Sequence, residues 1–147
     1  QEHGVPVFEA MHSPHHALHR EVVDLVGSGR LGRLYRIEAH FDAPVSRDPG
    51  EFRWKAALGG GALMDLGVYP LAWARRLAGE DFDILSAEAD IDDGVDARFS
   101  AELRFASGVD AMIGSDMTGA RRADMTLIFD RGEVTIQNFL APQLGHR

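Results

Sequence analysis

The sequence predicts an α+β fold, with an open, mostly antiparallel sheet that carries helices on one face. Two observations lead to this fold class. Apolar residues recur at helical spacing in two early segments, whereas most later segments alternate between apolar and polar residues with a period of two. A few helices followed by a run of strands is typical of α+β domains rather than of alternating α/β folds.

The length and composition fit a single domain of this kind. The chain has 147 residues, of which 45% are hydrophobic and 26% are charged, as in ordinary globular proteins. A chain of this length can bury a substantial core. The net charge of −8 argues against a nucleic-acid partner.

Other classes are excluded by what the sequence lacks. Without cysteine there can be no disulfide framework, thiolate nucleophile or cysteine-based zinc site. No run approaches the roughly 18 apolar residues of a membrane span, and no signal sequence opens the chain. We therefore expect a cytoplasmic protein without membrane contact. We also expect no metal site, because no glutamate completes an H-E-x-x-H pattern among His12, His15, His16 and His19.

The first helix is predicted near the N-terminus, with Ser13 as N-cap and Pro14 in the first turn. Residues 27–29, Gly-Ser-Gly, should end it. Its apolar stripe is formed by Leu18, Val22, Leu25 and Val26. A strand over 34–41 follows, and alternation gives it one buried face formed by Tyr35, Ile37, Ala39 and Phe41.

Residues 42–58 should form a long loop, because they show no sustained period and contain Pro44, Pro49 and Gly50. Loops of this length in compact domains are usually functional or disordered. An aromatic and basic cluster at 52–55, Phe-Arg-Trp-Lys, lies in its second half. The cluster either contacts a ligand or packs the loop onto the core, and the residues favour neither alternative.

A second helix is predicted from about residue 61 to residue 77. It is apolar almost all round, which indicates burial on more than one side. Asp65 inside such a helix must be paired or lie in a polar cleft. Pro70 cannot donate to the carbonyl of Leu66 and should kink the helix next to Tyr69.

Asp65 and Tyr69 form a candidate functional pair, because residues four apart lie on one helix face. A carboxylate and a phenol held together can position a hydroxyl group and transfer a proton. The structural alternative is an acid near the helix N-terminus and a buried tyrosine with its hydroxyl paired. From spacing alone this alternative is the more common case.

The rest of the chain should form strands, predicted at 85–91, 98–105, 109–117, 125–129 and 133–139. Hairpin turns are expected at 107–108 and 130–132. One face of the sheet should carry the helices. The other face has mixed polarity, which suits either solvent or a subunit interface.

The stretch 59–77, GGGALMDLGVYPLAWARRL, resembles the signature of the substrate domain of the Gfo/Idh/MocA oxidoreductases. Tyrosine at the end of the signature is similar to the glucose–fructose oxidoreductase and dimeric dihydrodiol dehydrogenase branch. Flanking segments that fit the resemblance lie at 52–55, 105–108, 131–134 and 138–143. The resemblance covers nearly the whole chain. It implies a C-terminal domain similar to that of glyceraldehyde-3-phosphate dehydrogenase.

The resemblance also implies roles for individual residues. Tyr69 would be the general acid/base on the substrate hydroxyl or carbonyl, and Asp65 would orient the substrate and tune the tyrosine. The family's catalytic lysine, in a Glu-Lys-Pro motif, has no counterpart in this sequence. The residues implied to contact the substrate are Arg53, Trp54, Lys55, Gly60 and Gly61.

A cofactor and partners follow from the same resemblance. NAD or NADP would bind mainly to a preceding Rossmann domain, and the substrate would be a sugar, polyol or trans-diol. Residues 1–10 would be the end of that Rossmann domain and a junction strand. Residues 11–147 would be a substrate and oligomerisation domain, truncated at its C-terminus and forming homo-oligomers through its open sheet face. We expect the chain alone to be inactive.

The alternative function comes from another class, because fold and function can separate. In that case the chain would be a non-catalytic ligand-binding or oligomerisation domain.

Overall fold

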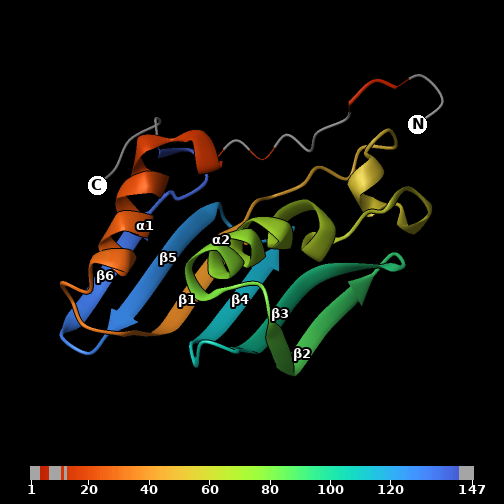
Figure 1. Ribbon diagram of the computed structural model, residues 1–147. Helices are drawn as coiled ribbons and strands as arrows, with labels where there is room; N and C mark the ends of the chain where they lie inside the picture. The colour runs from red at the N-terminus through yellow and green to blue at the C-terminus, as the bar shows by residue number, and fades with distance from the viewer. Residues whose placement is uncertain (1–3, 7–10, 12, 143–147) are drawn as a thin grey trace.

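The computed structural model describes residues 4–6, 11 and 13–142. Figure 1 shows two layers, a six-stranded open sheet and two helices on one of its faces. The helices are α1 (Ala17–Ser28) and α2 (Val68–Ala78). The strands are β1 (Leu34–Asp42), β2 (Phe82–Asp92), β3 (Val95–Phe105), β4 (Asp110–Asp116), β5 (Arg122–Phe129) and β6 (Gly132–Gln137). Most of the predicted junction at 1–10 lies outside the described residues.

The strand order is β2-β3-β4-β1-β5-β6. Strand β1 pairs in parallel with β4, while the other neighbours are antiparallel. The first strand of the chain therefore lies inside the sheet, where Ile37 and Ala39 are fully buried. The predicted fold class, an open and mostly antiparallel sheet with helices on one face, is confirmed.

The predicted start of the first helix is wrong. Residues Ser13–His15 form a 3₁₀ turn, and α1 begins after His16, whose ring Nδ1 accepts a hydrogen bond of 3.1 Å from the Leu18 N–H. His16 thus has the N-cap role that was predicted for Ser13. His15 and His19 consequently do not share one α-helix. The predicted end is confirmed, since Gly29 adopts the left-handed conformation with φ of 63°.

The predicted buried face of β1 is correct except at Tyr35, which is 45% exposed. The register with β5 shifts between Leu34 and Arg36, so Leu34 takes the buried place instead. Beyond the irregularity, the alternation continues as predicted, with Phe41 buried.

The predicted second helix is confirmed, but its first part is not α-helical. Residues Leu63–Gly67 form a π-helical turn, in which the Leu63 carbonyl accepts from the Val68 N–H, and α2 begins only at Val68. Pro70 consequently lies in the first turn of α2, where a missing N–H costs little. The irregularity that we expected at Pro70 is taken up by the π-turn before it.

Gly67 brings this turn close to the sheet. A Cβ there would lie 3.2 Å from the Ser115 Oγ of β4 and 3.3 Å from the ring of Phe99 in β3.

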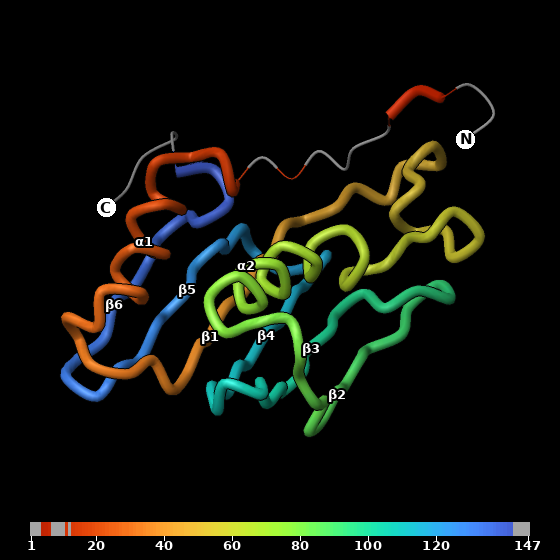
Figure 2. The backbone as a smooth tube through the Cα atoms, viewed as in Figure 1, coloured from red at the N-terminus to blue at the C-terminus, as the bar shows by residue number. Residues whose placement is uncertain are grey.

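The later strands follow the predicted alternation and turns. In β3, Ala101, Leu103 and Phe105 are buried, and the predicted turns join β3 to β4 and β5 to β6. Strand β2 starts earlier than predicted and is exposed along almost its whole length, because it is an edge strand. Figure 2 shows that the loop after β1 reaches the same end of the molecule as the β2–β3 turn, where Arg47 pairs with Asp92.

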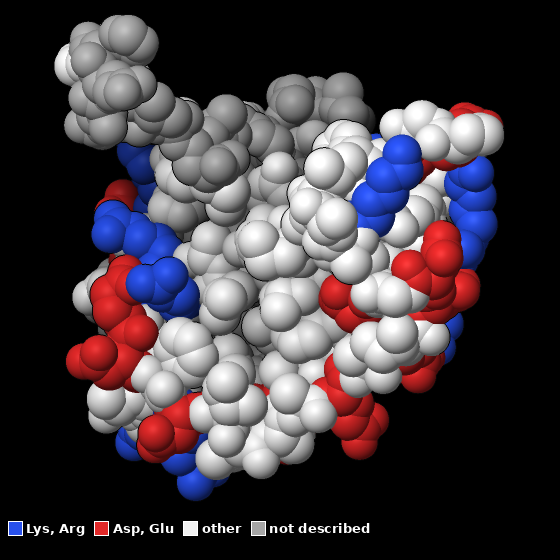
Figure 3. Space-filling model, turned by 90° about the vertical axis from the view of Figure 1, so that its right-hand side faces the viewer, with Lys and Arg blue, Asp and Glu red and all other residues white. Residues whose placement is uncertain are grey.

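The sheet face opposite the helices carries cross-strand ion pairs. Arg104 lies 2.8 Å from Asp110, and Arg98 lies 2.9 Å from Asp116. Figure 3 shows a different side of the molecule, the right-hand side of Figure 1, where acidic and basic side chains are intermixed along the margins of a mostly uncharged centre. No helix of the described part of the chain is long and apolar enough to cross a membrane.

Candidate active site

Asp65 and Tyr69 line the same cavity, although they come from different helical turns. Asp65 lies in the π-turn, and Tyr69 lies in the first turn of α2. The cavity has a volume of about 380 Å³. Its other walls come from the end of β1, the loop after β1 and two later segments, and include Phe41, Ala43, Pro44, Val45, Ser46, Glu51, Arg53, Leu66, Arg121 and Leu140.

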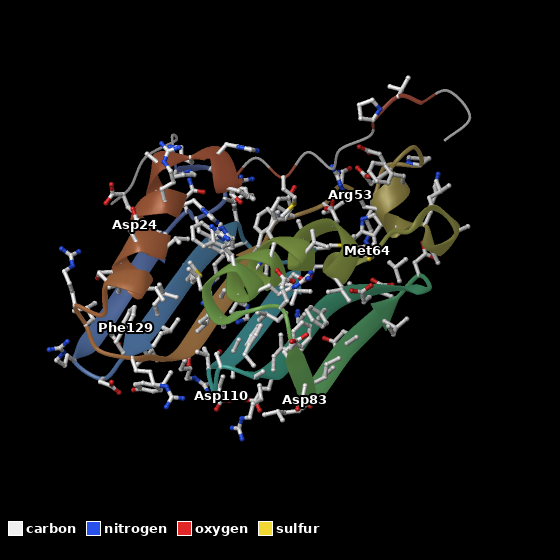
Figure 4. The ribbon with its side chains drawn as sticks, in the orientation of Figure 1. Asp24, Arg53, Met64, Asp83, Asp110 and Phe129 are labelled. Atoms are coloured by element: carbon white, nitrogen blue, oxygen red, sulfur yellow. The ribbon has the colours of Figure 1, made fainter. Side chains whose placement is uncertain are left out.

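Arg53 joins two carboxylates at one side of this cavity, beside the π-turn that also carries Met64 (Figure 4). Its Nε lies 3.1 Å from the Asp65 Oδ2, held by charge and not by an aligned hydrogen bond. Its Nη1 lies 3.1 Å from the Glu51 Oε2, and its backbone N–H donates to the other Glu51 oxygen at 3.2 Å. The Asp65 side chain is 27% exposed, so the pair offsets part of the cost of placing a carboxylate in an apolar segment.

The Tyr69 ring is fixed by an aromatic neighbour. It meets the ring of Phe41 edge-on, with centroids 5.5 Å apart and an angle of 83° between the planes. Since Phe41 is a buried residue of β1, the phenol is anchored to the centre of the sheet.

The glycines explain how Arg53 comes to lie beside Asp65. The Gly61 N–H donates to the Arg53 carbonyl at 2.9 Å, and the Gly60 N–H donates to the Lys55 carbonyl at 3.1 Å. A Cβ on Gly60 would lie 2.3 Å from the Arg53 carbonyl oxygen, and a Cβ on Gly61 would lie 2.0 Å from the Asp96 Oδ1. The segment 52–58 can therefore fold back onto the π-turn only because residue 60 lacks a side chain, and Gly61 leaves room for the Asp96 carboxylate.

Trp54 and Lys55, predicted to contact the substrate, lie on a different cavity of about 210 Å³. Trp54 is 6% exposed, and its indole Nε1–H donates to the Ser46 carbonyl at 3.0 Å, under the guanidinium of Arg47. Lys55 donates from its Nζ to the Pro49 carbonyl at 3.1 Å. These contacts favour the packing alternative for Trp54. A substrate role for either residue stays a prediction.

The sequence did not point to three residues of this region. Glu51 directly precedes the cluster and caps its turn, a pattern that could have identified it. The Asp96 carboxylate accepts a hydrogen bond of 2.7 Å from the Leu63 N–H at the start of the π-turn. Neither Asp96 nor Arg121 has a local signal, because both reach the site only through the fold.

A larger cavity, of about 590 Å³, lies between α1 and α2. It contains the ring of His19 against that of Trp73, with centroids 4.4 Å apart, and the side chains of Arg20 and Arg76. Burial is the main cause that lowers the pKa of His19, helped by the charge of Arg76. This cavity includes neither Asp65 nor Tyr69. In the part of the chain that the structure describes, no group of three His, Asp or Glu side chains is placed to hold a metal ion.

Comparison with known proteins places this chain in a family. Residues 19–135 match the model of the GFO/IDH/MocA C-terminal domain. A dTDP-3,4-didehydro-2,6-dideoxy-α-D-glucose 3-reductase of Streptomyces violaceoruber is 35% identical over 100% of this chain and 44% of its own length. The D-xylose 1-dehydrogenase (NADP(+)) 2 of Haloferax volcanii is 30% identical over 78% of this chain and 35% of its own length.

Solved structures agree with these sequence matches. KijD10, a 3-ketoreductase from Actinomadura kijaniata in complex with NADP and TDP-benzene, superposes with a TM-score of 0.86 at 29% identity, over 95% of this chain and 43% of KijD10. The aldose–aldose oxidoreductase of Caulobacter crescentus, complexed with glycerol, gives a TM-score of 0.80 at 29% identity, over 87% of this chain and 40% of its own. The chain thus spans less than half the length of these relatives. It belongs to the GFO/IDH/MocA family and contains the C-terminal domain of that family.

Proposed function

We propose that this chain forms the substrate side of an NAD(P)-dependent oxidoreductase that acts on a CH–OH or carbonyl group of a sugar, polyol or diol. The observation that carries the proposal is the shared cavity of Asp65 and Tyr69, in which Arg53 and Glu51 hold the aspartate. The relatives support it, since they include a sugar ketoreductase and a sugar dehydrogenase.

The dinucleotide does not fit the glycines of this chain. The space beside Gly60 and Gly61 is filled by the backbone of Arg53 and the carboxylate of Asp96. The Leu63 N–H, a donor that a phosphate would need, already binds Asp96. We infer that the residues that hold the cofactor lie outside those described, and the steps below concern only this chain's side chains.

In the proposed reduction, the Tyr69 hydroxyl donates its proton to the carbonyl oxygen of the substrate. A bound dinucleotide would supply the hydride. In the oxidation direction, the Tyr69 phenolate takes up the proton of the substrate hydroxyl and becomes the neutral phenol. The Asp65 carboxylate accepts a hydrogen bond from a neighbouring substrate hydroxyl and orients the sugar. Arg53 acts through Asp65 as a positioning residue.

The test is Tyr69→Phe in the full-length protein that contains this chain. Loss of a positioned general acid should lower kcat about 100- to 10,000-fold, with cofactor affinity unchanged. The matched control is Tyr35→Phe, since Tyr35 is an exposed tyrosine on β1 that does not line this cavity. Turnover that survives in Tyr69→Phe would remove Tyr69 from the mechanism.

A second candidate function is a non-catalytic ligand-binding or oligomerisation domain. The observation that favours it is the uncovered sheet face, together with the exposed edge strand β2, on which Ile84 and Ile91 are 65% and 68% exposed. Such a domain would form a homo-oligomer through this face. Light scattering that finds a monomer at all concentrations would count against this candidate.

A further inference from the structure

Arg121 is an exposed cation that lines the cavity of Asp65 and Tyr69. It directly precedes β5 and comes from the loop that joins β4 to β5. The cavity therefore has an arginine from each of two loops far apart in sequence, Arg53 and Arg121.

The segment that carries Arg121 is fixed on both sides. The Asp116 Oδ1 accepts hydrogen bonds from the Thr118 N–H at 2.7 Å, the Thr118 hydroxyl at 2.7 Å and the Gly119 N–H at 3.0 Å. Burial alone would raise the pKa of Asp116, but hydrogen bonds from Thr118 and Arg98 outweigh it and lower that pKa. On the other side, the Ala123 carbonyl accepts from the Phe139 N–H at 3.0 Å.

The two arginines of the cavity differ in their partners. Arg53 lies against both Glu51 and Asp65, so its charge is balanced. Arg122, next to Arg121 in sequence, pairs with Asp124. Arg121 has no ion-pair partner among residues 4–6, 11 and 13–142, although the chain carries a net charge of −8 and carboxylates are in excess.

The two ends of the cavity therefore differ in charge. At the end with Asp65 and Glu51, Arg53 compensates only one of two negative charges, so this end still repels an anion. At Arg121, a planar guanidinium is available for a phosphate, which it can bind through two parallel hydrogen bonds. A neutral sugar would leave this charge to solvent.

Resting on the function proposed above, we propose that Arg121 selects a phosphorylated sugar, either a monoester or the diphosphate of a sugar nucleotide. The phosphate binds at Arg121 while the reacting carbon lies at Tyr69. The relatives leave this choice open, since they include a dTDP-sugar reductase and a D-xylose dehydrogenase. Arg121 assigns this protein to the anionic class.

The experiment is calorimetric binding to the full-length protein, with dTDP-D-glucose, D-glucose 6-phosphate and D-glucose as probes. The wild type should bind at least one anionic probe more tightly than D-glucose. Arg121→Gln should lower the affinity for that anionic probe about tenfold or more, while the affinity for D-glucose is unchanged. The control is Arg30→Gln, which removes another exposed arginine, one that does not line this cavity.

The pattern of loss identifies the source of the phosphate. If Arg121→Gln lowers the affinity for dTDP-D-glucose alone, the ligand is a sugar nucleotide. If it lowers the affinity for D-glucose 6-phosphate alone, the ligand is a phosphate monoester. Equal loss for charged and neutral probes, no loss at all, or a wild type that prefers D-glucose would overturn the inference. Because binding is measured without turnover, these outcomes are separate from failure of the Tyr69→Phe test, which concerns the reaction itself.

Discussion

Two cavities flank α2, one at its first turn and one along the side that faces α1. The first has a volume of about 380 Å³, and the second is larger, at about 590 Å³. In the smaller cavity, Glu51, Arg53 and Asp65 form a continuous chain of charges beside Tyr69. In the larger one, the rings of His19 and Trp73 are in tilted contact, and Arg75 pairs with Glu80 at its lining.

The difference between the cavities lies in how their polar groups are held. Asp65 is fixed by Arg53, which in turn is fixed by the turn of residues 52–58 and the glycines after it. The indole Nε1–H of Trp73 has no hydrogen-bond acceptor within the described residues. Arranged charges, and not volume, therefore mark the candidate active site on this domain.

Among the changes that distinguish the two cavities, Arg53→Gln in the full-length protein should have the largest effect on catalysis. The substitution leaves Glu51 and Asp65 without their shared cation, so the orientation of Asp65 is lost. We expect kcat/KM to fall about 10- to 100-fold, the cost of a lost charged hydrogen bond or ion pair. Arg75→Gln, at the edge of the larger cavity, is the matched control and should stay close to wild type.

A double-mutant cycle with Asp65→Asn tests whether Arg53 acts through Asp65. If it does, Arg53→Gln should add little to the loss already caused by Asp65→Asn, because both changes disrupt one unit. Fully additive losses would mean that Arg53 contacts the substrate independently, as the family resemblance implied.

A smaller effect, on stability, is expected for Gly60→Ala. The added Cβ would lie 2.3 Å from the Arg53 carbonyl oxygen, which cannot move without displacing the turn. Overpacking of this kind typically costs about 1–3 kcal/mol in the free energy of unfolding. Urea unfolding should show this loss, together with reduced turnover, since Arg53 is displaced from Asp65.

The control for that prediction is Gly50→Ala in the same loop. A Cβ at Gly50 meets no atom within 4 Å, so stability should change little. Equal unfolding midpoints for the two variants would show that the loop adapts, and the glycines would then not be what places Arg53.

The sequence predicted those parts of the fold that depend on local pattern. Alternation located β3 and its buried Leu103, the hairpin turns were placed by their glycines, and Gly29 ended α1 as expected. The spacing of Asp65 and Tyr69 predicted that the two residues share one helix face, and both line one cavity. In each case, the residues that decide the structure are neighbours in sequence.

The remaining features depend on contacts between distant residues. The π-turn is capped by Asp96, which lies on β3, and the loop before the turn folds back onto it. The parallel pairing of β1 with β4 likewise joins residues far apart in the chain. No periodicity in the sequence could reveal Arg121 as a wall of the cavity, since only the fold brings it there.

The smallest effect concerns the larger cavity and its histidine. His19 is 6% exposed, and its pKa is lowered from 6.5, chiefly by burial and further by Arg76 and His15. Because the folded pKa lies below the unfolded value, the unfolded chain binds more protons as the pH falls. The stability from neutral His19 is therefore present above about pH 6.5 and lost below it, toward the folded pKa.

We expect the free energy of unfolding to decrease between pH 7.5 and pH 5.5, and His19→Gln to reduce that decrease. His40, whose pKa is also lowered mainly by burial, contributes in the same direction, so His19→Gln should be measured in a His40→Gln background as well. Turnover of His19→Gln in the full-length protein should match wild type. If the free energy of unfolding of His19→Gln depended on pH as steeply as that of wild type, His19 would not be linked to stability through its proton. If His19→Gln lost as much turnover as Arg53→Gln, the α1–α2 cavity would be part of the reaction site. The distinction drawn between the two cavities would then be wrong.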